Sequence, residues 1–269
     1  MAYITLPEKI ILSGDQMISS KDNNKIKHIR KLLEKSKTRR EERRFVIEGF
    51  KAVREAVKRG LVDEIFASED VVELCDDLDV TDVVSSGLFK EISDTVTPQG
   101  ILAIVRFPEY DIDELFSNNN CKLICLEDVR DPGNIGTIIR TAEGAGMDAV
   151  ILSKGCADVY QPKVTRATMG SVLRVPCIVC EDAFPNELDR LKKSGFTVFG
   201  AYLDGAVDYR EPDYVGKVAV LIGNEANGLT DETVAKCDKL IKIPMKGELE
   251  SLNAAVSAAI LSYEVDRHR

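Results

Sequence analysis

The stretch Asp131-Pro-Gly-Asn-Ile-Gly-Thr-Ile-Ile-Arg-Thr-Ala142 decides the fold of the chain, because it joins an apolar strand to a helix through a tight turn. Residues 123–126 are continuously apolar, as in a strand that is covered on both faces. Pro132 and Gly133 favour a turn, and Asn134 is of a type that caps helix N-termini. Strand, turn and helix form the repeating unit of an open α/β sheet, which binds ligands at the carboxyl ends of its strands.

Two later segments have the same arrangement. The apolar residues 218–222 are followed by Gly223-Asn-Glu-Ala-Asn-Gly228, and Ile243-Pro-Met245 follows a further strand and leads to Ser251 and Asn253 at the start of the last helix. Glycines allow close backbone approach to a ligand, and free amide groups at a helix start bind carboxylates or phosphates. Ordinary turns and caps explain each segment equally well, so the prediction of a site rests on all three together.

The remaining pattern predicts an α/β fold with two domains. Residues 1–107 form a smaller α/β domain, the acidic and polar residues 108–120 form a linker, and residues 121–269 form a larger domain with a mostly parallel, doubly covered sheet. Strands are expected at 45–48, 64–67, 80–84, 100–105, 123–126, 149–152, 175–179, 197–201, 218–222 and 240–243. Helices are expected within 19–59 and at 85–92, 134–145, 162–173, 185–193, 231–236 and 251–266, with 37–44 as a charged loop.

The net charge of −9 hides a strong asymmetry along the chain. Residues 21–60 carry +9, whereas residues 61–269 carry −17. A local positive potential captures phosphates whatever the total charge, although a solvated basic helix face is an equally good explanation of the segment alone. No apolar run approaches the roughly 20 residues that a membrane helix needs, and no signal-peptide pattern occurs. The expected location is therefore the cytoplasm, with no membrane partner.

Seven cysteines and two histidines limit the possible chemistry. The one Cys-x-x-Cys pair, Cys177 and Cys180, lies in an apolar strand and lacks the second pair or the histidines that a zinc site needs. Buried, reduced thiols are the favoured interpretation, and no metal site is expected. The scarcity of histidine also argues against Ser-His-Asp or Cys-His hydrolysis. The glycine fingerprints of dinucleotide-binding folds and P-loops are absent, which disfavours a nucleotide-dependent oxidoreductase.

With all three segments in order, residues 121–265 resemble the SpoU (TrmH-like) branch of the SPOUT RNA ribose 2′-O-methyltransferases. Asp131-Pro-x-Asn-x-Gly-x-x-x-Arg-Thr-Ala142 resembles the first motif of that family and Gly223-Asn-Glu-x-x-Gly-Leu229 the second. Ile243-Pro-Met-x-Gly-x-x-Glu-Ser-Leu-Asn-x-x-Val256 resembles the third motif. Phe45-Val-Ile-Glu-Gly49 and Thr97-Pro-Gln-Gly100 are similar to the ribosomal-protein-L30e-like substrate-binding domain of the family.

The resemblance implies a trefoil knot in the C-terminal domain, a homodimer that completes the site, and S-adenosylmethionine as cofactor. Ribosomal RNA is favoured over transfer RNA as substrate; a non-catalytic RNA-binding or ribosome-assembly protein on the same fold is the alternative. The implied cofactor-binding residues are Gly223, Asn224, Gly228, Ile243, Met245, Ser251 and Leu252. The implied catalytic residues are Arg140, Asn134, Glu225, Ser251 and Asn253.

Arg140 matches the residue to which the family assigns its catalytic role. A guanidinium is a poor general base because it stays protonated. We therefore expect Arg140 to orient the adjacent phosphate and stabilise the developing alkoxide, while the phosphate or a transiently neutral guanidine accepts the proton. The alternative for Arg140 is a surface ion pair with Glu143 or Asp148. Phosphate contacts that position the RNA are expected from Lys37, Arg39, Arg40, Arg43 and Arg44.

Overall fold

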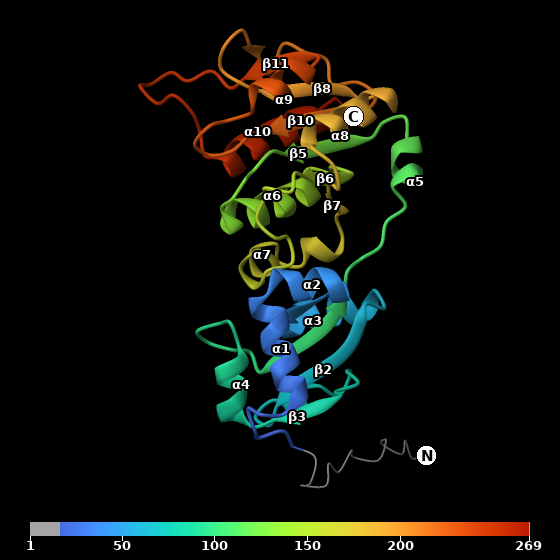
Figure 1. The fold of residues 1–269 in the computed structure, drawn as a ribbon, viewed down its shortest axis with the longest axis vertical. Helices are drawn as coiled ribbons and strands as arrows, with labels where there is room; N and C mark the ends of the chain where they lie inside the picture. The colour runs from blue at the N-terminus through green and yellow to red at the C-terminus, as the bar shows by residue number, and fades with distance from the viewer. Residues whose placement is uncertain (1–16, 269) are drawn as a thin grey trace, which may run out of the picture. The chain divides into compact units, whose positions relative to one another are not determined.

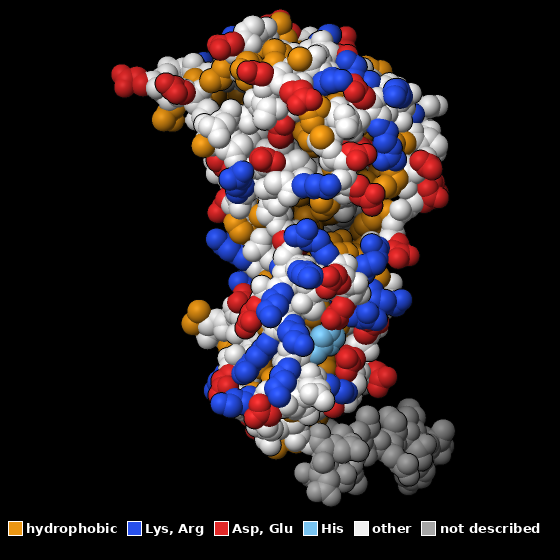
Figure 2. Space-filling model, in the orientation of Figure 1, with side chains coloured by type: hydrophobic (Ala, Val, Ile, Leu, Met, Phe, Trp, Pro, Cys, Tyr) orange, Lys and Arg blue, Asp and Glu red, His pale blue; other side chains and the backbone are white. Residues whose placement is uncertain are grey.

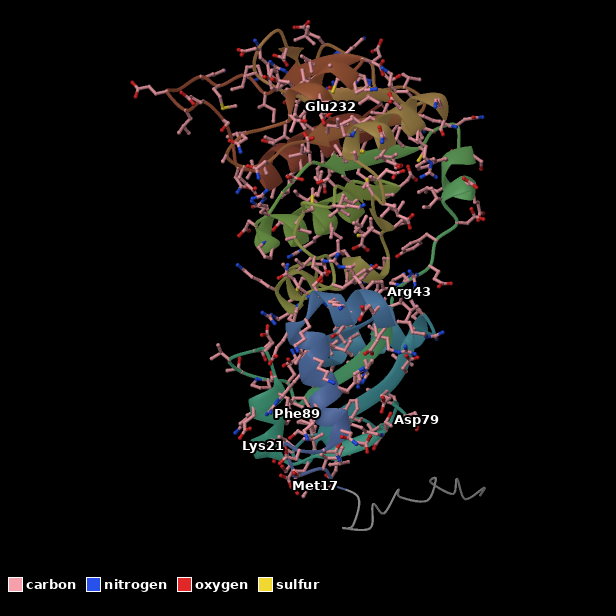
Figure 3. The ribbon with its side chains drawn as sticks, in the orientation of Figure 1. Met17, Lys21, Arg43, Asp79, Phe89 and Glu232 are labelled. Atoms are coloured by element: carbon pink, nitrogen blue, oxygen red, sulfur yellow. The ribbon has the colours of Figure 1, made fainter. Side chains whose placement is uncertain are left out.

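The computed structural model describes residues 17–268, and contacts within the chain divide them into two units (Figure 1). Unit 1 comprises residues 17–35 and 46–106, and unit 2 comprises residues 36–45 and 107–268. Figure 3 draws the side chains of the described residues from Met17 onward. Within this part of the chain, no helix is long and apolar enough to cross a bilayer.

Unit 1 is built on a four-stranded mixed sheet in the order β1-β4-β2-β3. β2 pairs antiparallel with β4 and parallel with β3. Helices α1 and α4 supply Ile26, Ile29, Leu32 and Phe89 to a core that they share with the sheet, and α3 packs against β2 and β4. The elements are α1 (Asn24–Glu34), β1 (Arg44–Glu48), α3 (Phe50–Lys58), β2 (Val62–Ser68), η1 (Val72–Leu74), β3 (Asp82–Val84), α4 (Ser86–Ile92) and β4 (Ile101–Arg106).

Unit 2 contains a seven-stranded sheet in the order β7-β6-β5-β10-β8-β11-β9, which Figure 1 shows from β7 to β11. Each neighbouring pair is parallel. The strands are β5 (Lys122–Leu126), β6 (Ala149–Leu152), β7 (Cys177–Val179), β8 (Thr197–Ala201), β9 (Val207–Asp208), β10 (Val218–Ile222) and β11 (Lys239–Lys242). The α/β class and the parallel C-terminal sheet predicted from the sequence are confirmed; the trefoil knot stays a prediction, because strand order alone does not describe how the chain passes through its loops.

Helices cover both faces of this sheet. α8 and α5 pack onto one face through residues such as Leu188 and Phe116, whereas α6 and α10 pack together on the other, where α10 contacts β5 and β10. Alternate residues of β5 and β10 point to opposite faces, and all are buried because both faces are covered. The helices of unit 2 are α2 (Ser36–Glu42), α5 (Ile112–Ser117), α6 (Pro132–Gly144), α7 (Pro162–Ala167), η2 (Ser171–Leu173), α8 (Phe184–Lys193), α9 (Asp231–Lys236) and α10 (Ala254–Asp266).

The structure differs from the sequence-based expectations in three places. Of residues 37–44, expected to be a loop, residues 37–42 form most of helix α2 and Arg44 begins β1; by its contacts α2 belongs to unit 2. The expected linker contains α5, whose Phe116 packs against Phe196 in the core of unit 2. The single helix expected over 162–173 is broken, because Met169 and Gly170 have φ values of +52° and +91° that no α-helix contains.

Candidate active site

Three loops at the carboxyl ends of strands are joined by the side chains of Glu225, Asn134 and Asn253. The Asn134 amide donates to Glu225 Oε1 at 2.8 Å, and the Asn253 amide donates to Asn134 Oδ1 at 3.0 Å. Asn134 lies in the first turn of α6 after β5, Glu225 follows β10, and Asn253 precedes α10. The structure therefore brings together three of the residues that the sequence predicted as a site.

The polarity of this chain of hydrogen bonds is fixed by its two ends. Glu225 can only accept when ionised, so the nitrogen of the Asn134 amide must face it. At the other end, Asn253 Oδ1 accepts from the main-chain N–H groups of Ala255 and Val256 as the N-cap of α10. Both amide orientations follow from this, and all three side chains are held by more than one partner.

The sequence suggested Asn134 as the N-cap of α6, but the structure shows a different residue in that position. Asp131 caps the helix by accepting from the Asn134 main-chain N–H at 2.8 Å, and Pro132 occupies the first turn, where its missing N–H is no loss. Because Asp131 takes the capping role, the side chain of Asn134 is free to link Glu225 to Asn253.

Glu225 is held as a carboxylate by its surroundings. Partial burial opposes its charge, but hydrogen bonds from the Asn134 amide and from main-chain N–H groups, including those of Arg130 and Asp131, outweigh this effect. The net result is a pKa below the ordinary 4.5. At neutral pH the carboxylate therefore acts as a fixed acceptor that ties residues 130–134 to the loop after β10.

A pocket of about 410 Å³ lies beside these loops, within the range of roughly 300–1,000 Å³ that is usual for small-molecule sites. Its walls include all seven residues named from the sequence as cofactor-binding: Gly223, Asn224, Gly228, Ile243, Met245, Ser251 and Leu252. Glu225 and Asn253 also line it. Residues 201–204 after β8 also line the pocket and were not predicted, although, like the other loops, they follow an apolar strand.

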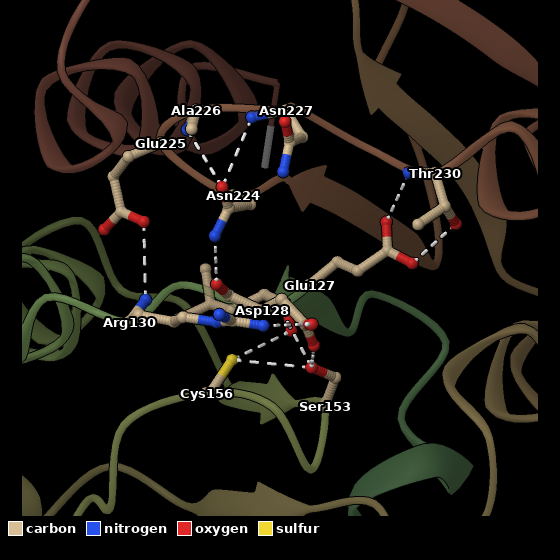
Figure 4. Close-up of polar contacts among 11 residues, drawn as sticks. Glu127, Asp128, Arg130, Ser153, Cys156, Asn224, Glu225, Ala226, Asn227 and Thr230 are labelled. Atoms are coloured by element: carbon tan, nitrogen blue, oxygen red, sulfur yellow. Dashed lines mark hydrogen bonds and ion pairs between the residues drawn. The ribbon is translucent and has the colours of Figure 1, made fainter.

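The 223–230 loop is closed on itself. Asn224 and Gly228 exchange two main-chain hydrogen bonds, and Asn224 Oδ1 accepts from the N–H groups of Ala226 and Asn227 (Figure 4). A Cβ atom on Gly223 would lie 2.1 Å from the carbonyl carbon of Gly228, so only glycine fits there. Leu229 is buried in the core and anchors the end of the loop. Backbone atoms of a preformed loop thus form one wall of the pocket.

Arg140 lies on the exposed side of α6 and has no hydrogen-bond or ion-pair partner among residues 17–268. The two alternative partners are engaged elsewhere: Glu143 pairs with Arg174, and Asp148 accepts from the main-chain N–H of Lys122. Arg140 does not line the pocket of its own chain. Ser251 lines the pocket and is exposed, also without a polar partner among the described residues.

The five basic residues expected to contact RNA have different environments. Lys37 and Arg40 are exposed on α2, Arg43 is exposed and paired with Glu109, and Arg44 donates to the carbonyl of Glu42. Arg39 contradicts the prediction, because its side chain is only 4 % exposed and donates twice to Asp158 Oδ2, at 3.0 and 2.7 Å. Its charge is neutralised inside unit 2 and cannot reach a phosphate.

The seven cysteines are free thiols, and five of them are buried, including Cys177 and Cys180. Burial raises the pKa of both of these thiols to about 12. A buried thiol with so high a pKa is not a nucleophile near neutral pH. The Cys-x-x-Cys pair is therefore part of the packing of the sheet, as the sequence favoured.

Comparison with known proteins finds matches over most of the chain. Residues 122–263 match the model of the SpoU rRNA Methylase family, and residues 23–103 match that of the MRM3-like substrate binding domain. The chain is 37 % identical to the 23S rRNA (guanosine(2553)-2′-O)-methyltransferase RlmP of Bacillus subtilis, over 93 % of this chain and 99 % of that protein.

Solved structures agree over nearly the same length. The AdoMet-bound rRNA methyltransferase from Sinorhizobium meliloti superposes with a TM-score of 0.84 at 32 % identity, covering 94 % of this chain and 98 % of that one. The SpoU methyltransferase AviRb from Streptomyces viridochromogenes, in complex with AdoMet, gives a TM-score of 0.80 at 27 % identity, covering 91 % and 98 %. The chain belongs to the SpoU rRNA methylase family, the S-adenosylmethionine-dependent methyltransferases of RNA ribose 2′-hydroxyls.

Proposed function

We propose that this chain methylates the ribose 2′-hydroxyl of one nucleotide in 23S ribosomal RNA, in the cytoplasm, with a guanosine as the first nucleotide to test. The relative from Bacillus subtilis, which matches 93 % of this chain, is named for methylation of a guanosine in that RNA. The single observation that carries the proposal is the ordered chain Glu225–Asn134–Asn253, which ties three motif loops together beside the pocket.

The pocket suits S-adenosylmethionine in size and in the chemistry of its walls. Ile222, Ile243 and Leu252 offer apolar surface for an adenine ring, and the closed 223–230 loop presents main-chain polar groups. Carboxylates at Asp204, Glu225 and Glu250 favour a ligand that carries positive charge. When bound, this cofactor supplies an electrophilic methyl group on a sulfonium.

Arg140 is the residue best suited to act on the RNA. Its guanidinium is permanently charged and has no partner among the described side chains, so it is available to bind a phosphate through two parallel hydrogen bonds. Held in this way, the phosphate next to the target ribose is fixed in orientation. The remaining positive charge stabilises the alkoxide that forms as the 2′-hydroxyl loses its proton, and the phosphate is the proposed proton acceptor.

The test uses 23S RNA from cells that lack the gene as substrate, with transfer RNA as the alternative substrate. Methylation of each RNA is measured with the wild-type protein and with the Arg140→Ala variant. Because one donor that stabilises a developing oxyanion contributes about 10²–10³ in rate, we expect kcat to fall by at least about a hundredfold. Arg140→Lys keeps the positive charge but not the planar guanidinium that makes two parallel hydrogen bonds, and it serves as the matched variant. Near-normal methylation by Arg140→Ala, with intact binding of S-adenosylmethionine, contradicts the assignment.

RNA is proposed to contact the basic surface of the N-terminal half. Figure 2 shows Lys and Arg side chains gathered over α1, where Lys27 and Lys31 are exposed, as is Lys35 directly after the helix. In unit 2, Lys37 and Arg40 on α2 are also exposed and are proposed as separate phosphate contacts. Contacts of this kind position an RNA and are salt-dependent, but they carry no sequence information of their own.

A homodimer is proposed to complete the site. α10 is apolar along most of its length, and Val256 and Tyr263 remain 47 % and 56 % exposed on it. Tyr263 lies beside Gly144 of α6, the helix that carries Arg140. Because Arg140 does not line the pocket of its own chain, pairing of these helices with a second copy is a route by which Arg140 of one copy reaches the pocket of the other.

A further inference from the structure

A buried carboxylate outside the three motifs holds the end of the 223–230 loop. Glu127 follows β5 directly and is only 5 % exposed. Its Oε2 accepts from the main-chain N–H of Thr230 at 2.9 Å, and its Oε1 accepts from the Thr230 hydroxyl at 2.8 Å (Figure 4). Oε1 also accepts from the hydroxyl of Thr233 at 2.6 Å. No lysine or arginine among residues 17–268 forms an ion pair with it.

A carboxylate in this position is costly unless every acceptor site has a donor. Burial of an ionised group away from water is strongly unfavourable, and here three neutral hydrogen bonds replace the hydration shell. All three donors belong to one short segment, the end of the 223–230 loop and the first turn of α9. An apolar side chain would fill the space more simply, so what Glu127 contributes is the placement of that segment.

Glu127 is also the first of three successive ties between residues 127–131 and the 223–230 loop. The carbonyl of Asp128 accepts from the Asn224 amide at 2.7 Å, and Glu225 accepts from the N–H group of Arg130 (Figure 4). Glu225 also accepts from the N–H group of Asp131. The main chain is joined as well, since the Glu127 N–H donates to the Ile222 carbonyl. Two ties hold the start of the loop, and Glu127 alone holds its end through side-chain bonds.

We propose that Glu127 is the positioning residue that fixes the 223–230 loop in its cofactor-binding shape before S-adenosylmethionine arrives. The proposal rests on the pocket being the cofactor site. Glu127 itself does not line the pocket, so it acts through Thr230 and Thr233 on the main chain of the loop. Without it the loop has to be ordered on binding, and that cost reduces affinity for the cofactor and leaves affinity for RNA unchanged.

Glu127→Gln is the sharpest variant, because it keeps the size of the side chain. Its amide has one accepting oxygen in place of two, whichever way it is turned. Either the Thr230 N–H or the protons of the Thr230 and Thr233 hydroxyls therefore lose their acceptor. Thr233→Val removes one hydroxyl from the network, and Thr233→Ser retains it. Asp148→Asn is the matched control, since it weakens a carboxylate bond to the Lys122 N–H at the opposite end of β5.

Two measurements test the proposal in the full-length protein. Calorimetry gives the Kd for S-adenosylmethionine, and amide hydrogen exchange of the ligand-free protein reports opening of residues 224–230. Because a buried polar group left unpaired is expensive, we expect Glu127→Gln to raise this Kd by about tenfold or more and to speed exchange in the loop. Thr233→Val should have a smaller effect of the same kind. Thr233→Ser, which retains the hydroxyl, should bind the cofactor as wild type does.

The outcomes separate positioning from general stability. If Glu127→Gln lowers the melting temperature but leaves the cofactor Kd within about twofold of wild type, the proposal is overturned. It is equally overturned if Asp148→Asn weakens cofactor binding as much at a comparable loss of melting temperature. Failure of the wild-type protein to bind S-adenosylmethionine would instead contradict the proposed function, which keeps the two failures distinct.

Discussion

Arg39 and Arg40 are neighbours in the sequence with opposite environments, and only one of them is available to RNA. Arg39 is buried against Asp158, whereas Arg40 is exposed and, among residues 17–268, bonds only to Ser36 within its own helix. An ion pair removed from water leaves an unpaired charge when one partner is lost, but an exposed cation contributes little to stability. The two positions therefore separate folding from RNA binding.

We predict that Arg39→Ala lowers the free energy of unfolding by about 3 kcal/mol, because Asp158 is left buried without its partner. Arg40→Ala should change stability by less than about 0.5 kcal/mol while reducing the salt dependence of RNA binding by about one phosphate contact. Urea unfolding and a salt titration of RNA affinity measure the two effects. A salt slope that changes equally in both variants contradicts the assignment of Arg39.

Local sequence patterns predict some residues of the site and not others. Two of the loops that line the pocket, at 223–228 and 243–253, could be predicted because glycine and polar side chains follow apolar strands, and the family resemblance supplied their individual residues. The role of Asn134 was mistaken, because Asp131 and Asn134 are both good caps and only the geometry of the turn decides between them. The burial of Arg39 depends on Asp158, which is distant in the sequence, and no local pattern reports such a partner.

At the scale of elements, the 223–230 loop depends on a glycine for steric reasons, and the neighbouring loop does not. A Cβ atom at Gly223 would overlap the main chain of Gly228, which cannot give way as a flexible side chain would. Gly247, in the exposed segment before Ser251, has no atom within 4 Å of its Cβ position. The two glycines thus form a natural pair of tests.

We predict that Gly223→Ala weakens binding of S-adenosylmethionine by at least about tenfold, because the loop must open to accept the methyl group. Gly247→Ala should leave the affinity within about twofold of wild type. Calorimetry with the purified variants checks both values, and circular dichroism confirms that each is folded. Equal affinity of Gly223→Ala and wild type would show that the backbone of this loop does not shape the site.

Regular elements could be predicted where period and length agreed with burial. Strands β5 and β10 are short apolar runs, and parallel sheets covered on both faces have this pattern. Helix α2 was missed because its charged sequence gives no apolar period, and its stability comes from Arg39 and from contacts within unit 2. The break after α7 was missed because Met169 adopts a left-handed conformation that its residue type does not predict.

For the whole molecule, the proposed exchange of Arg140 between two copies has a direct test. A heterodimer is prepared from one Arg140→Ala chain and one Leu252→Trp chain, whose pocket is filled. If Arg140 of one copy serves the pocket of the other, one site of the heterodimer has both defects and the second site has none. We then expect about half of wild-type methylation per dimer, although each variant alone is inactive.

If Arg140 serves its own pocket, each site of the heterodimer carries one defect and the dimer is inactive. Mass measurement of the wild-type protein and of Val256→Asp, which introduces a charge on the exposed face of α10, provides the control for association. A wild-type protein that is monomeric at working concentration contradicts the dimer itself. The test therefore distinguishes absence of a dimer from the wrong assignment of Arg140 within one.

The position of α2 in unit 2 has a consequence for modular exchange of this protein's parts. Phe107 stacks on Tyr160 and Phe45 packs against both rings, while Arg39 neutralises Asp158. A methylase fragment cut after residue 107 therefore loses three side chains that complete its own interior. A chimaera of this catalytic half with another RNA-binding domain must therefore retain residues 36–45. The new RNA-binding domain has to be inserted between residues 45 and 107, not joined to the end of the methylase.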